Sequence, residues 1–457
     1  MRLEFLDRTR EVDRLTKALA AQEPGFIVVF GRRRCGKSTL LQQVIRPGDI
    51  YYAADQREAP LQRRTLAGEV ARRIRGFDEV EYPSWLVLLQ TLDARAERGT
   101  CLVLDEFPYL VQISPELPSL VQKFLDDPAR RIHLAICGSS QGMMQGLILN
   151  PAAPLYGRAS QVLAIRPLAP FWIQQALEVH GTEAIEQYAV WGGVPRYWEL
   201  ARDCTGLQAA VEELVLDKYG VLHSEPERLL LDDMRSTVQA SSLLSLIASG
   251  CHRLSEIGAR LGKPAGHLTR PLAQLIELGY IRREVPFGET TKSTRRSLYK
   301  LNDPFLIFWY RYVQPSRSLL ERDLIDDVTR AIRTTFAQHV ADIWEDLARL
   351  STAALPVGNI RWKPAQRWWG RGLDGQPMEI DLVAESLDGE ALLLAEVKWQ
   401  ERPNQGAVFD RLRYCAANFP QVRGRETILG AWLKQGGAET QPREFVVHPA
   451  GTLAALR

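Results

Sequence analysis

One short stretch near the start of the chain, residues 25–41, restricts the fold more than any other, and it reads GFIVVFGRRRCGKSTLL. The apolar residues 26–30 predict a buried strand, and the motif G-x-x-x-x-G-K-[ST] follows from Gly31 to Ser38. Apolar residues at helical spacing come directly after it. Glycines let the backbone curl so that successive N–H groups face a phosphate, and the N-terminus of a helix favours negative charge. The pattern therefore predicts a phosphate-binding loop between a strand and a helix.

The charged and hydroxyl residues of this loop indicate its ligand. Lys37 is expected to reach the β- and γ-phosphates of a nucleoside triphosphate, and Ser38 is expected to hold Mg²⁺. The predicted cofactors are therefore ATP and Mg²⁺.

A second apolar stretch, residues 101–106, reads CLVLDE and ends in two acids. A buried parallel strand delivers such carboxylates to a ligand crevice at its C-terminal end. Asp105 suits the Mg²⁺ shell, and Glu106 suits a base that orients the attacking water. Because predicted strands alternate with predicted helices throughout this region, we expect a parallel, doubly wound sheet.

Two more polar residues lie beside predicted strands of the same sheet. Ser139 follows the strand predicted at 132–137, where it is either a sensor of the γ-phosphate or a simple cap of the strand end. Arg158 precedes the strand predicted at 161–165. It is either a surface charge or a cation that stabilises charge on the phosphates in the transition state, and spacing alone does not decide.

Six segments that occur in this order resemble the archaeal-type ATPase family, within the AAA+/STAND class of P-loop NTPases: FLDRTREVDRL, GRRRCGKST, LVLDEF, CGSS, PLYGR and GGVPRY. The resemblance covers roughly the first half of the chain. It implies that Gly31–Thr39, which includes Gly36, is the Walker A motif and that Asp105 and Glu106 form Walker B. It also implies three further residues of the nucleotide site, namely Ser139 near sensor 1, Arg158 as an arginine of the site, and Pro195 beside the base.

The sequence pattern in the middle of the chain predicts two mainly helical segments. Residues 169–237 predict a helical lid and a linker, and residues 238–312 predict three helices followed by two strands around a polar loop. This order resembles a winged helix-turn-helix, which places its third helix and its loop on DNA. The residues expected to contact DNA are His267, Arg270, Lys292, Arg295 and Arg296. The alternative is a structural or protein-docking module, because the basic residues cluster in the loop instead of covering the helix.

Carboxylates and a lysine recur at strand spacing in residues 320–457. Glu396 and Lys398 are two residues apart, so they share one face of a predicted strand, and Asp381 lies on the strand before it. Carboxylates that converge near a lysine make a Mg²⁺ site with a cation beside it, suited to hydrolysis at phosphorus. The alternative is a surface ion pair without activity.

This constellation resembles the PD-(D/E)xK nuclease superfamily, and the domain resembles the restriction-endonuclease-like domain often fused to archaeal-type ATPases. The resemblance maps Glu345 to an acid on a helix, Asp381 to the central acid, and Glu396 with Lys398 to the E-x-K motif. The chain departs from the pattern at Ile380, where the superfamily has proline.

The length, the net charge and the cysteine content of the chain exclude several classes of protein. The chain has 457 residues, a net charge of +2 and six cysteines without a C-x-x-C motif, so neither a disulfide framework nor a zinc site is indicated. The first residues are too charged for a signal peptide, and no apolar run is long enough to span a membrane. We therefore expect a cytoplasmic protein that makes no contact with a membrane.

The predicted architecture is an α/β multidomain chain with a P-loop ATPase core (1–168), a helical lid and linker (169–237), a winged helix (238–312) and a nuclease-like domain (320–457). The leading hypothesis is an ATP-hydrolysing protein that acts on DNA and whose C-terminal domain is a Mg²⁺-dependent endonuclease. The alternatives are a signalling switch of the STAND type and a protein-remodelling ATPase, in which that domain cuts nothing. An oligomer or a partner protein is left open.

Overall fold

A computed structural model describes residues 3–234, 236–290, 292, 294, 296–355, 360–422, 424–436 and 441–457. The chain divides into two compact units. The first, called the nucleotide unit, comprises Leu3–Leu168 with Leu229–Arg235, and the second, called the C-terminal unit, comprises Ala169–Arg228 with Ser236–Arg457.

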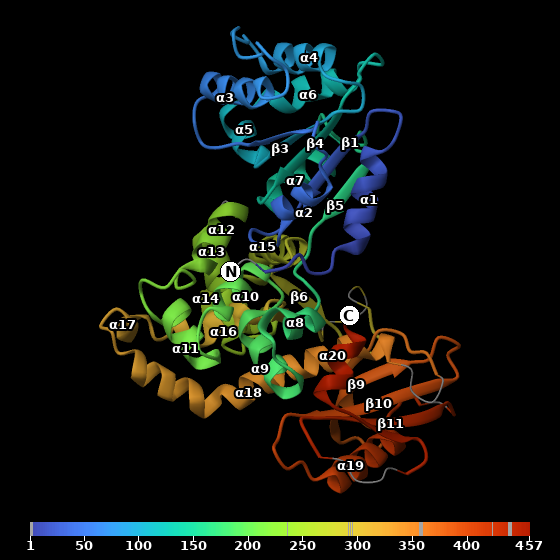
Figure 1. Cartoon of the computed structure of the whole chain (residues 1–457). Coiled ribbons are helices and arrows are strands. Elements are labelled where there is room, and N and C mark those ends of the chain that lie inside the picture. The colour runs from blue at the N-terminus through green and yellow to red at the C-terminus, as the bar shows by residue number, and fades with distance from the viewer. Residues whose placement is uncertain are drawn as a thin grey trace. The chain divides into compact units, whose positions relative to one another are not determined.

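The nucleotide unit is built on a parallel five-stranded sheet with the order β2-β3-β4-β1-β5 (Figure 1). Its strands are β1 (Phe26–Phe30), β2 (Ile50–Ala53), β3 (Cys101–Asp105), β4 (His133–Gly138) and β5 (Gln161–Ala164). Its helices are α1 (Thr9–Leu19), α2 (Lys37–Val44), α3 (Ala59–Ala71), α4 (Trp85–Arg95), α5 (Phe107–Ile113), α6 (Leu117–Leu125) and α7 (Gln141–Ile148). The expected parallel sheet with a P-loop NTPase-like core is confirmed.

Burial on both faces explains why β1 is a continuous apolar run. All residues of β1, β3 and β4 are buried. Phe26, Val28 and Phe30 belong to a core that includes Leu66 of α3 and Leu88 of α4, while α1 and α2 lie on the opposite side of the sheet in Figure 1. Strands covered on both faces are uniformly apolar, and they carry their polar residues at their ends.

The C-terminal unit contains a mixed five-stranded sheet with the order β12-β11-β10-β9-β8, in which β8, β9 and β10 are antiparallel and β10, β11 and β12 are parallel. These strands are β8 (Gln366–Arg371), β9 (Pro377–Glu385), β10 (Ala391–Lys398), β11 (Glu426–Leu433) and β12 (Glu444–Val447), and a separate antiparallel pair is β6 (Ile281–Glu284) with β7 (Leu298–Leu301). The helices are α8 (Ile173–Leu177), α9 (Gly181–Trp191), α10 (Pro195–Arg202), α11 (Leu207–Val211), α12 (Glu225–Asp233, which ends in the nucleotide unit), α13 (Thr237–Ala248), α14 (Leu254–Leu261), α15 (Ala265–Glu277), α16 (Pro304–Phe308), α17 (Arg317–Leu320), α18 (Ile325–Ser351), α19 (Gln405–Asn418) and α20 (Pro449–Ala455).

The sequence predicts two helical stretches after residue 320, with the second at 336–350, but the structure joins them into α18, a single helix of 27 residues. The reason is an uninterrupted helical spacing of buried side chains, since Val328, Ile332, Val340 and Ile343 all face the interior. The part that carries Glu345 is therefore a continuation of a long helix.

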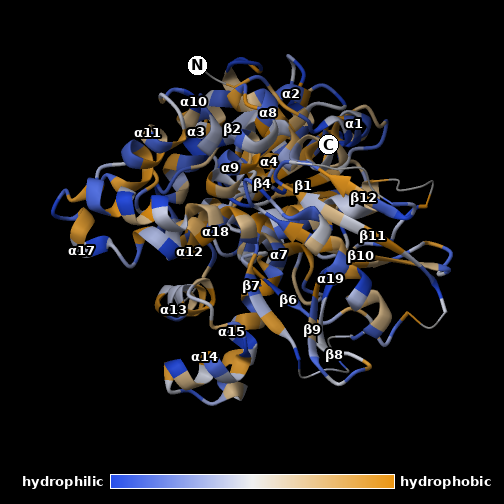
Figure 2. Ribbon diagram, turned by 90° about the horizontal axis from the view of Figure 1, so that it is seen from below, coloured by the Kyte–Doolittle hydropathy of each residue, from blue (hydrophilic) through white to orange (hydrophobic). Residues whose placement is uncertain are grey.

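Helices α13, α14 and α15 precede the β6–β7 hairpin, in which Ile281 pairs with Leu301. Figure 2 shows hydrophilic and hydrophobic residues side by side on α14, as expected for a helix with one buried face. None of the described helices combines the length and the apolar character needed to cross a lipid bilayer.

Candidate functional site

The backbone of the phosphate loop depends on two glycines. Gly31 has φ +152°, and a Cβ atom there would lie 2.2 Å from the carbonyl oxygen of Ile165. Gly36 has φ +84°, a left-handed conformation that side chains disfavour, and it immediately precedes α2. The curl that the motif predicts is therefore accessible only because these two positions lack side chains.

Lys37 and Thr39 lie in the first turn of α2. The Lys37 side chain is buried, and its Nζ donates a hydrogen bond to the carbonyl oxygen of Arg32, 3.1 Å away. Because Arg32 belongs to the loop itself, the ammonium group lies inside the curl of the backbone. That is where a phosphate would meet both this cation and the N-terminus of a helix.

Asp105, at the end of β3, lies against the phosphate loop. Its Oδ2 accepts a hydrogen bond from Ser38 Oγ at 2.6 Å and another from the Tyr51 hydroxyl, and its Oδ1 accepts one from the Glu106 amide at 2.9 Å. Burial acts to raise the pKa of Asp105, but the hydrogen bonds from Ser38 and Tyr51 outweigh it and hold the pKa below its ordinary value. A charged carboxylate beside a hydroxyl oxygen is a donor set that fits Mg²⁺.

Glu106 directly follows β3 and has a left-handed backbone, with φ 52°. Its Oε2 accepts hydrogen bonds from Ser139 Oγ at 2.9 Å and from the Ser139 amide at 3.3 Å. Ser139 follows the adjacent strand β4, so neighbouring strands bring the residue expected to be the base and the residue expected to be the sensor together.

Arg158 and Pro195 are the other two residues predicted for the nucleotide site. Arg158 forms an ion pair with Asp126, with 2.8 Å between Nε and Oδ1, and donates to the carbonyl oxygen of Pro154. Pro195 is the first residue of α10 in the C-terminal unit. Their roles at the nucleotide stay predictions.

Of two further residues near the loop, Tyr51 was not predicted as a site residue, whereas the sequence leaves Arg8 as either a surface charge or an adenine contact. Tyr51 reaches Asp105 from β2, as described above, and Arg8 is buried and donates to the carbonyl oxygens of Cys35 and Arg166. A tyrosine within a strand belongs to no motif, so the position of Tyr51 in space was its only signal.

The C-terminal carboxylates and Lys398 form a second cluster. Lys398 Nζ lies 2.5 Å from Glu396 Oε1 and 3.8 Å from Asp381 Oδ2, and Asp381 Oδ2 also accepts a hydrogen bond from the Val397 amide at 3.0 Å. The adjacent strands β9 and β10 thus bring together the residues that the spacing had paired.

Glu345 on α18 interacts with the charge of Asp381 in this cluster. Burial, and then the charge of Asp381, raise the pKa of Glu345 to about 7, and the same two causes raise the pKa of Glu396. Burial acts to lower the pKa of Lys398, but its hydrogen bond to Glu396 outweighs this and raises the pKa. Carboxylates that resist ionisation together are a group that a cation would stabilise.

One carboxylate oxygen of Glu396 is buried without a hydrogen-bond donor among the described residues. Its Oε2 is buried and accepts no hydrogen bond from the described residues, although Arg411 Nε lies 3.5 Å away as an ion-pair partner. As they stand, the described residues include no group of three or more His, Cys, Asp or Glu side chains arranged to hold a metal ion. These donors fit a divalent cation by chemistry and charge, and holding one would need them to draw closer.

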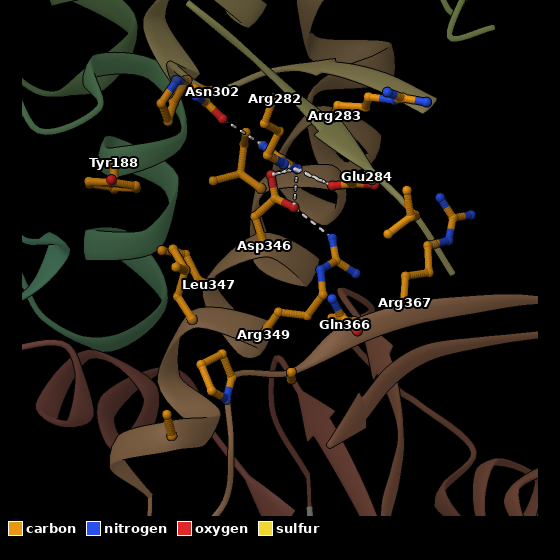
Figure 3. Close-up of a pocket in the computed structure, with 17 residues that line it drawn as sticks. Tyr188, Arg282, Arg283, Glu284, Asn302, Asp346, Leu347, Arg349, Gln366 and Arg367 are labelled. Carbon is orange, nitrogen blue, oxygen red and sulfur yellow. Dashed lines mark hydrogen bonds and ion pairs between the residues drawn. The ribbon is translucent and has the colours of Figure 1, made fainter. Parts of the chain in front are cut away.

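Arg349 connects this cluster to a buried ion network. It donates to the main-chain oxygen of Asp381 at 2.8 Å, lies 3.6 Å from Glu345 Oε2, and bonds Asp346 Oδ1 at 2.6 Å. Asp346 in turn accepts from Arg282 of β6 (Figure 3). Arg282, Asp346 and Arg349 line a cavity of 510 Å³, together with residues of β8.

The basic residues of the β6–β7 loop and of α15 differ in their environment. Arg296 pairs with Glu289 and donates to the main-chain oxygen of Trp369 at 3.1 Å. His267, Arg270 and Lys292 are exposed. Arg295, which is also expected to contact DNA, lies outside the described residues.

Comparisons with known proteins agree with this geometry. Residues 5–200 match the model of an ATPase domain found predominantly in Archaea, and residues 309–408 match a model of archaeal and bacterial proteins of unknown function. A protein of Methanocaldococcus jannaschii, described as uncharacterised, is 30% identical over 404 residues, which are 87% of this chain and 88% of that protein.

A solved structure of an archaeal ATPase shows a similar fold. The Walker-type ATPase of Pyrococcus abyssi has a TM-score of 0.51 and 21% identity, and the match covers 67% of this chain and 96% of that structure. The Aeropyrum pernix ORC2 protein, solved in ADPNP–ADP complexes, has a TM-score of 0.41 and 16% identity, with 73% and 96% covered. The loop geometry, the parallel sheet, the matched ATPase domain and the relative across most of the chain lead to one conclusion: the chain belongs to the archaeal-type ATPase family.

Proposed function

We propose that the chain binds ATP with Mg²⁺ in the loop Gly31–Thr39 and hydrolyses it. One observation carries the proposal: Ser38 Oγ and Asp105 Oδ2 lie 2.6 Å apart beside the buried Lys37, while Glu106 follows directly on the same strand end. A hydroxyl, a carboxylate, a cation and a second carboxylate are the parts that phosphoryl transfer needs.

The residues of the loop and of the neighbouring strand ends have separate roles in this mechanism. Lys37 and the backbone N–H groups of the loop bind the phosphates, and Ser38 with Asp105 would hold Mg²⁺, which neutralises charge on the phosphates when bound. Glu106 releases its hydrogen bonds from Ser139 and orients a water molecule towards the γ-phosphate. It then accepts a proton from that water as the water attacks. Ser139 is then free to hydrogen-bond the γ-phosphate, and Arg158 would stabilise charge on the phosphates in the transition state.

Replacing Glu106 by glutamine tests the hydrolytic step. Glutamine keeps the size and hydrogen-bonding capacity of the side chain but cannot accept the proton, so we expect ATP turnover to fall about 100-fold or more while ATP affinity stays near that of the parent. The measurement is steady-state phosphate release beside equilibrium binding of a labelled ATP. Glu116→Gln, an exposed change on the same unit, should leave both quantities unchanged. Normal turnover in Glu106→Gln would remove Glu106 from the mechanism.

We propose a second activity for residues 320–457: Mg²⁺-dependent cleavage of DNA at Glu345, Asp381, Glu396 and Lys398. The proximity of Lys398 Nζ to both Glu396 and Asp381 supports it, together with the buried Glu396 oxygen that accepts no hydrogen bond from the described part of the chain. Asp381 and Glu396 would hold the metal, which supplies an activated water when bound, and Lys398 would stabilise charge at phosphorus. Residues 238–312 would act as a winged helix that presents DNA, through His267, Arg270 and Lys292.

The pKa of Glu345 gives this proposal a pH dependence. Because burial and Asp381 hold that pKa at about 7, Glu345 is mostly neutral at pH 6 and mostly charged at pH 8. A metal ion binds the charged form, so we expect Mn²⁺ to bind this site about tenfold more tightly at pH 8 than at pH 6. The measurement is Mn²⁺ titration followed by thermal shift at the two pH values, in the Asp105→Asn background so that the Ser38–Asp105 pair does not also bind Mn²⁺.

The Glu345→Gln variant provides the comparison. Glutamine does not titrate, so the rise in Mn²⁺ affinity between pH 6 and pH 8 should be largely lost. In the metal-free protein, the stability of the fold changes with pH in the opposite direction to Mn²⁺ affinity. The raised pKa of Glu345 stabilises the folded state at low pH, and this contribution is lost as the pH rises from the range in which an ordinary carboxylate titrates through 7. An equal rise in Mn²⁺ affinity in parent and variant would show that Glu345 is not part of the site.

A further inference from the structure

A short acidic segment, Asp232 and Asp233, packs inside the nucleotide unit although it is remote in sequence from the phosphate loop. Residues Leu229–Arg235 belong to this unit, whereas the chain on both sides of them belongs to the C-terminal unit. Leu229 and Leu230 are buried, and they anchor the segment. The segment therefore reaches the nucleotide site as an insertion from another part of the chain.

The first contact of the acidic segment is with the variable part of the phosphate loop. Arg33 Nη1 lies 3.2 Å from Asp232 Oδ2, and Arg33 Nη2 donates to the Tyr109 hydroxyl at 3.3 Å. Asp232 Oδ2 is buried and accepts no hydrogen bond of good geometry from the described residues. The ion pair with Arg33 therefore offsets the cost of burying this charged oxygen. Burial raises the pKa of Asp232 above its ordinary value, and the charges of Arg33 and, to a smaller extent, Lys37 offset this only in part.

The second contact is with the start of α7, immediately after Ser139. Asp233 Oδ1 accepts a hydrogen bond from the Gln141 amide at 2.8 Å, and Ser140 Oγ donates to the main-chain oxygen of Asp232 at 2.8 Å. A carboxylate at a helix N-terminus is favourable because the helix dipole and the free N–H groups attract negative charge. The acidic segment thus bridges the loop before α2 and the strand end that carries the predicted γ-phosphate sensor.

We propose that Asp232 and Asp233 form an autoinhibitory latch: their carboxylates serve as an internal counter-charge at the phosphate loop, and the terminal phosphate of ATP displaces them. This inference rests on the proposed binding of ATP at Gly31–Thr39. It also assigns a role to the basic residues within the loop, because Arg33 holds the latch when no triphosphate is bound.

The physical basis of the latch is repulsion between like charges that share the same cations. A bound triphosphate brings several negative charges to Lys37 and to the neighbouring loop, and Asp232 is partly buried, so water screens it only weakly. Closure of the latch must therefore weaken ATP binding, and ATP binding must weaken closure by the same factor. ADP, which lacks the terminal phosphate, should open the latch less.

The double variant Asp232→Asn/Asp233→Asn tests the latch in the full-length chain. Asparagine keeps the shape of each side chain and the acceptor oxygen for Gln141, but removes both charges. We expect ATP affinity to rise about tenfold, and ADP affinity to rise less. The matched control is Asp13→Asn/Glu23→Gln, which removes the same charge from exposed positions of the same unit and should leave ATP affinity unchanged.

A second measurement uses the parent protein and does not depend on how the variant folds. Amide hydrogen exchange in residues 229–234 should speed up on addition of a non-hydrolysable ATP analogue, and speed up less with ADP. Equal ATP affinity in the double variant and its control, or unchanged exchange in residues 229–234 at saturating analogue, would overturn the latch while leaving the ATP site intact. Failure of the parent to bind ATP at all would instead refute the proposed function from which the latch follows.

Discussion

Replacing Lys37 by alanine should weaken ATP binding about 100-fold, as measured by equilibrium titration with a fluorescent ATP analogue. Hydrogen bonds to charged groups contribute about 1.5–3 kcal/mol, and each 1.4 kcal/mol is a factor of ten in affinity. Lys37 is buried beside the loop carbonyl of Arg32, so its replacement removes a cation from inside the curl of the loop. ATP turnover should fall with the affinity.

Lys17→Ala is the matched control for Lys37→Ala. Lys17 lies on α1 in the same unit, its side chain is 78% exposed, and its ion pair with Asp13 is a surface one. Such pairs contribute about 0–1 kcal/mol, so this variant should bind ATP like the parent. ATP affinity retained in Lys37→Ala, with the same melting temperature as the parent, would refute the assignment of the phosphate loop.

Replacing Asp381 by asparagine should abolish Mg²⁺-dependent cleavage of DNA and leave ATP turnover intact. Asparagine can still accept the hydrogen bond from the Val397 amide, so the pairing of β9 and β10 is preserved while the negative charge is lost. Lys398→Met should reduce cleavage about 100-fold or more, because it removes a charge that stabilises the transition state. The measurement is cleavage of supercoiled and linear DNA with Mg²⁺ or Mn²⁺, with and without ATP.

Asp410→Asn provides the control for the nuclease test. Asp410 lies on α19 with a side chain that is 76% exposed, so its replacement should change neither cleavage nor ATP turnover. Cleavage by the parent that persists in Asp381→Asn would indicate a contaminating nuclease or another site. A parent protein that cuts none of these substrates would favour the alternative functions, a signalling switch or a protein-remodelling ATPase with a silent C-terminal domain.

The nucleotide unit could be predicted well because its signals are local. The strand, loop and helix around Gly31 are contiguous, and an apolar strand that ends in Asp105 and Glu106 follows a parallel pattern. Parallel strands gather their carboxyl ends at one edge of the sheet, so the order of motifs along the chain was enough to predict their proximity.

Contacts between distant segments could not be predicted in this way. Tyr51 on Asp105, Arg33 on Asp232, and Arg349 on Asp381 join residues 54, 199 and 32 positions apart, and none of these pairs belongs to a spacing rule. The long helix α18 was divided in the prediction for a related reason, since its charged residues mask a periodicity that becomes clear only when the buried face is known.

The contact between Arg349 and Asp381 has an evolutionary consequence. Arg349 binds the main-chain oxygen of residue 381 and the side chain of Asp346, and neither partner depends on which side chain position 381 carries. A descendant that lost the carboxylate at 381 would keep this anchor between α18 and β9, although it would lose the side-chain acceptor for the Val397 amide. The proposed cleavage of DNA could therefore be lost by a single substitution at position 381 while the main-chain anchor of α18 is retained.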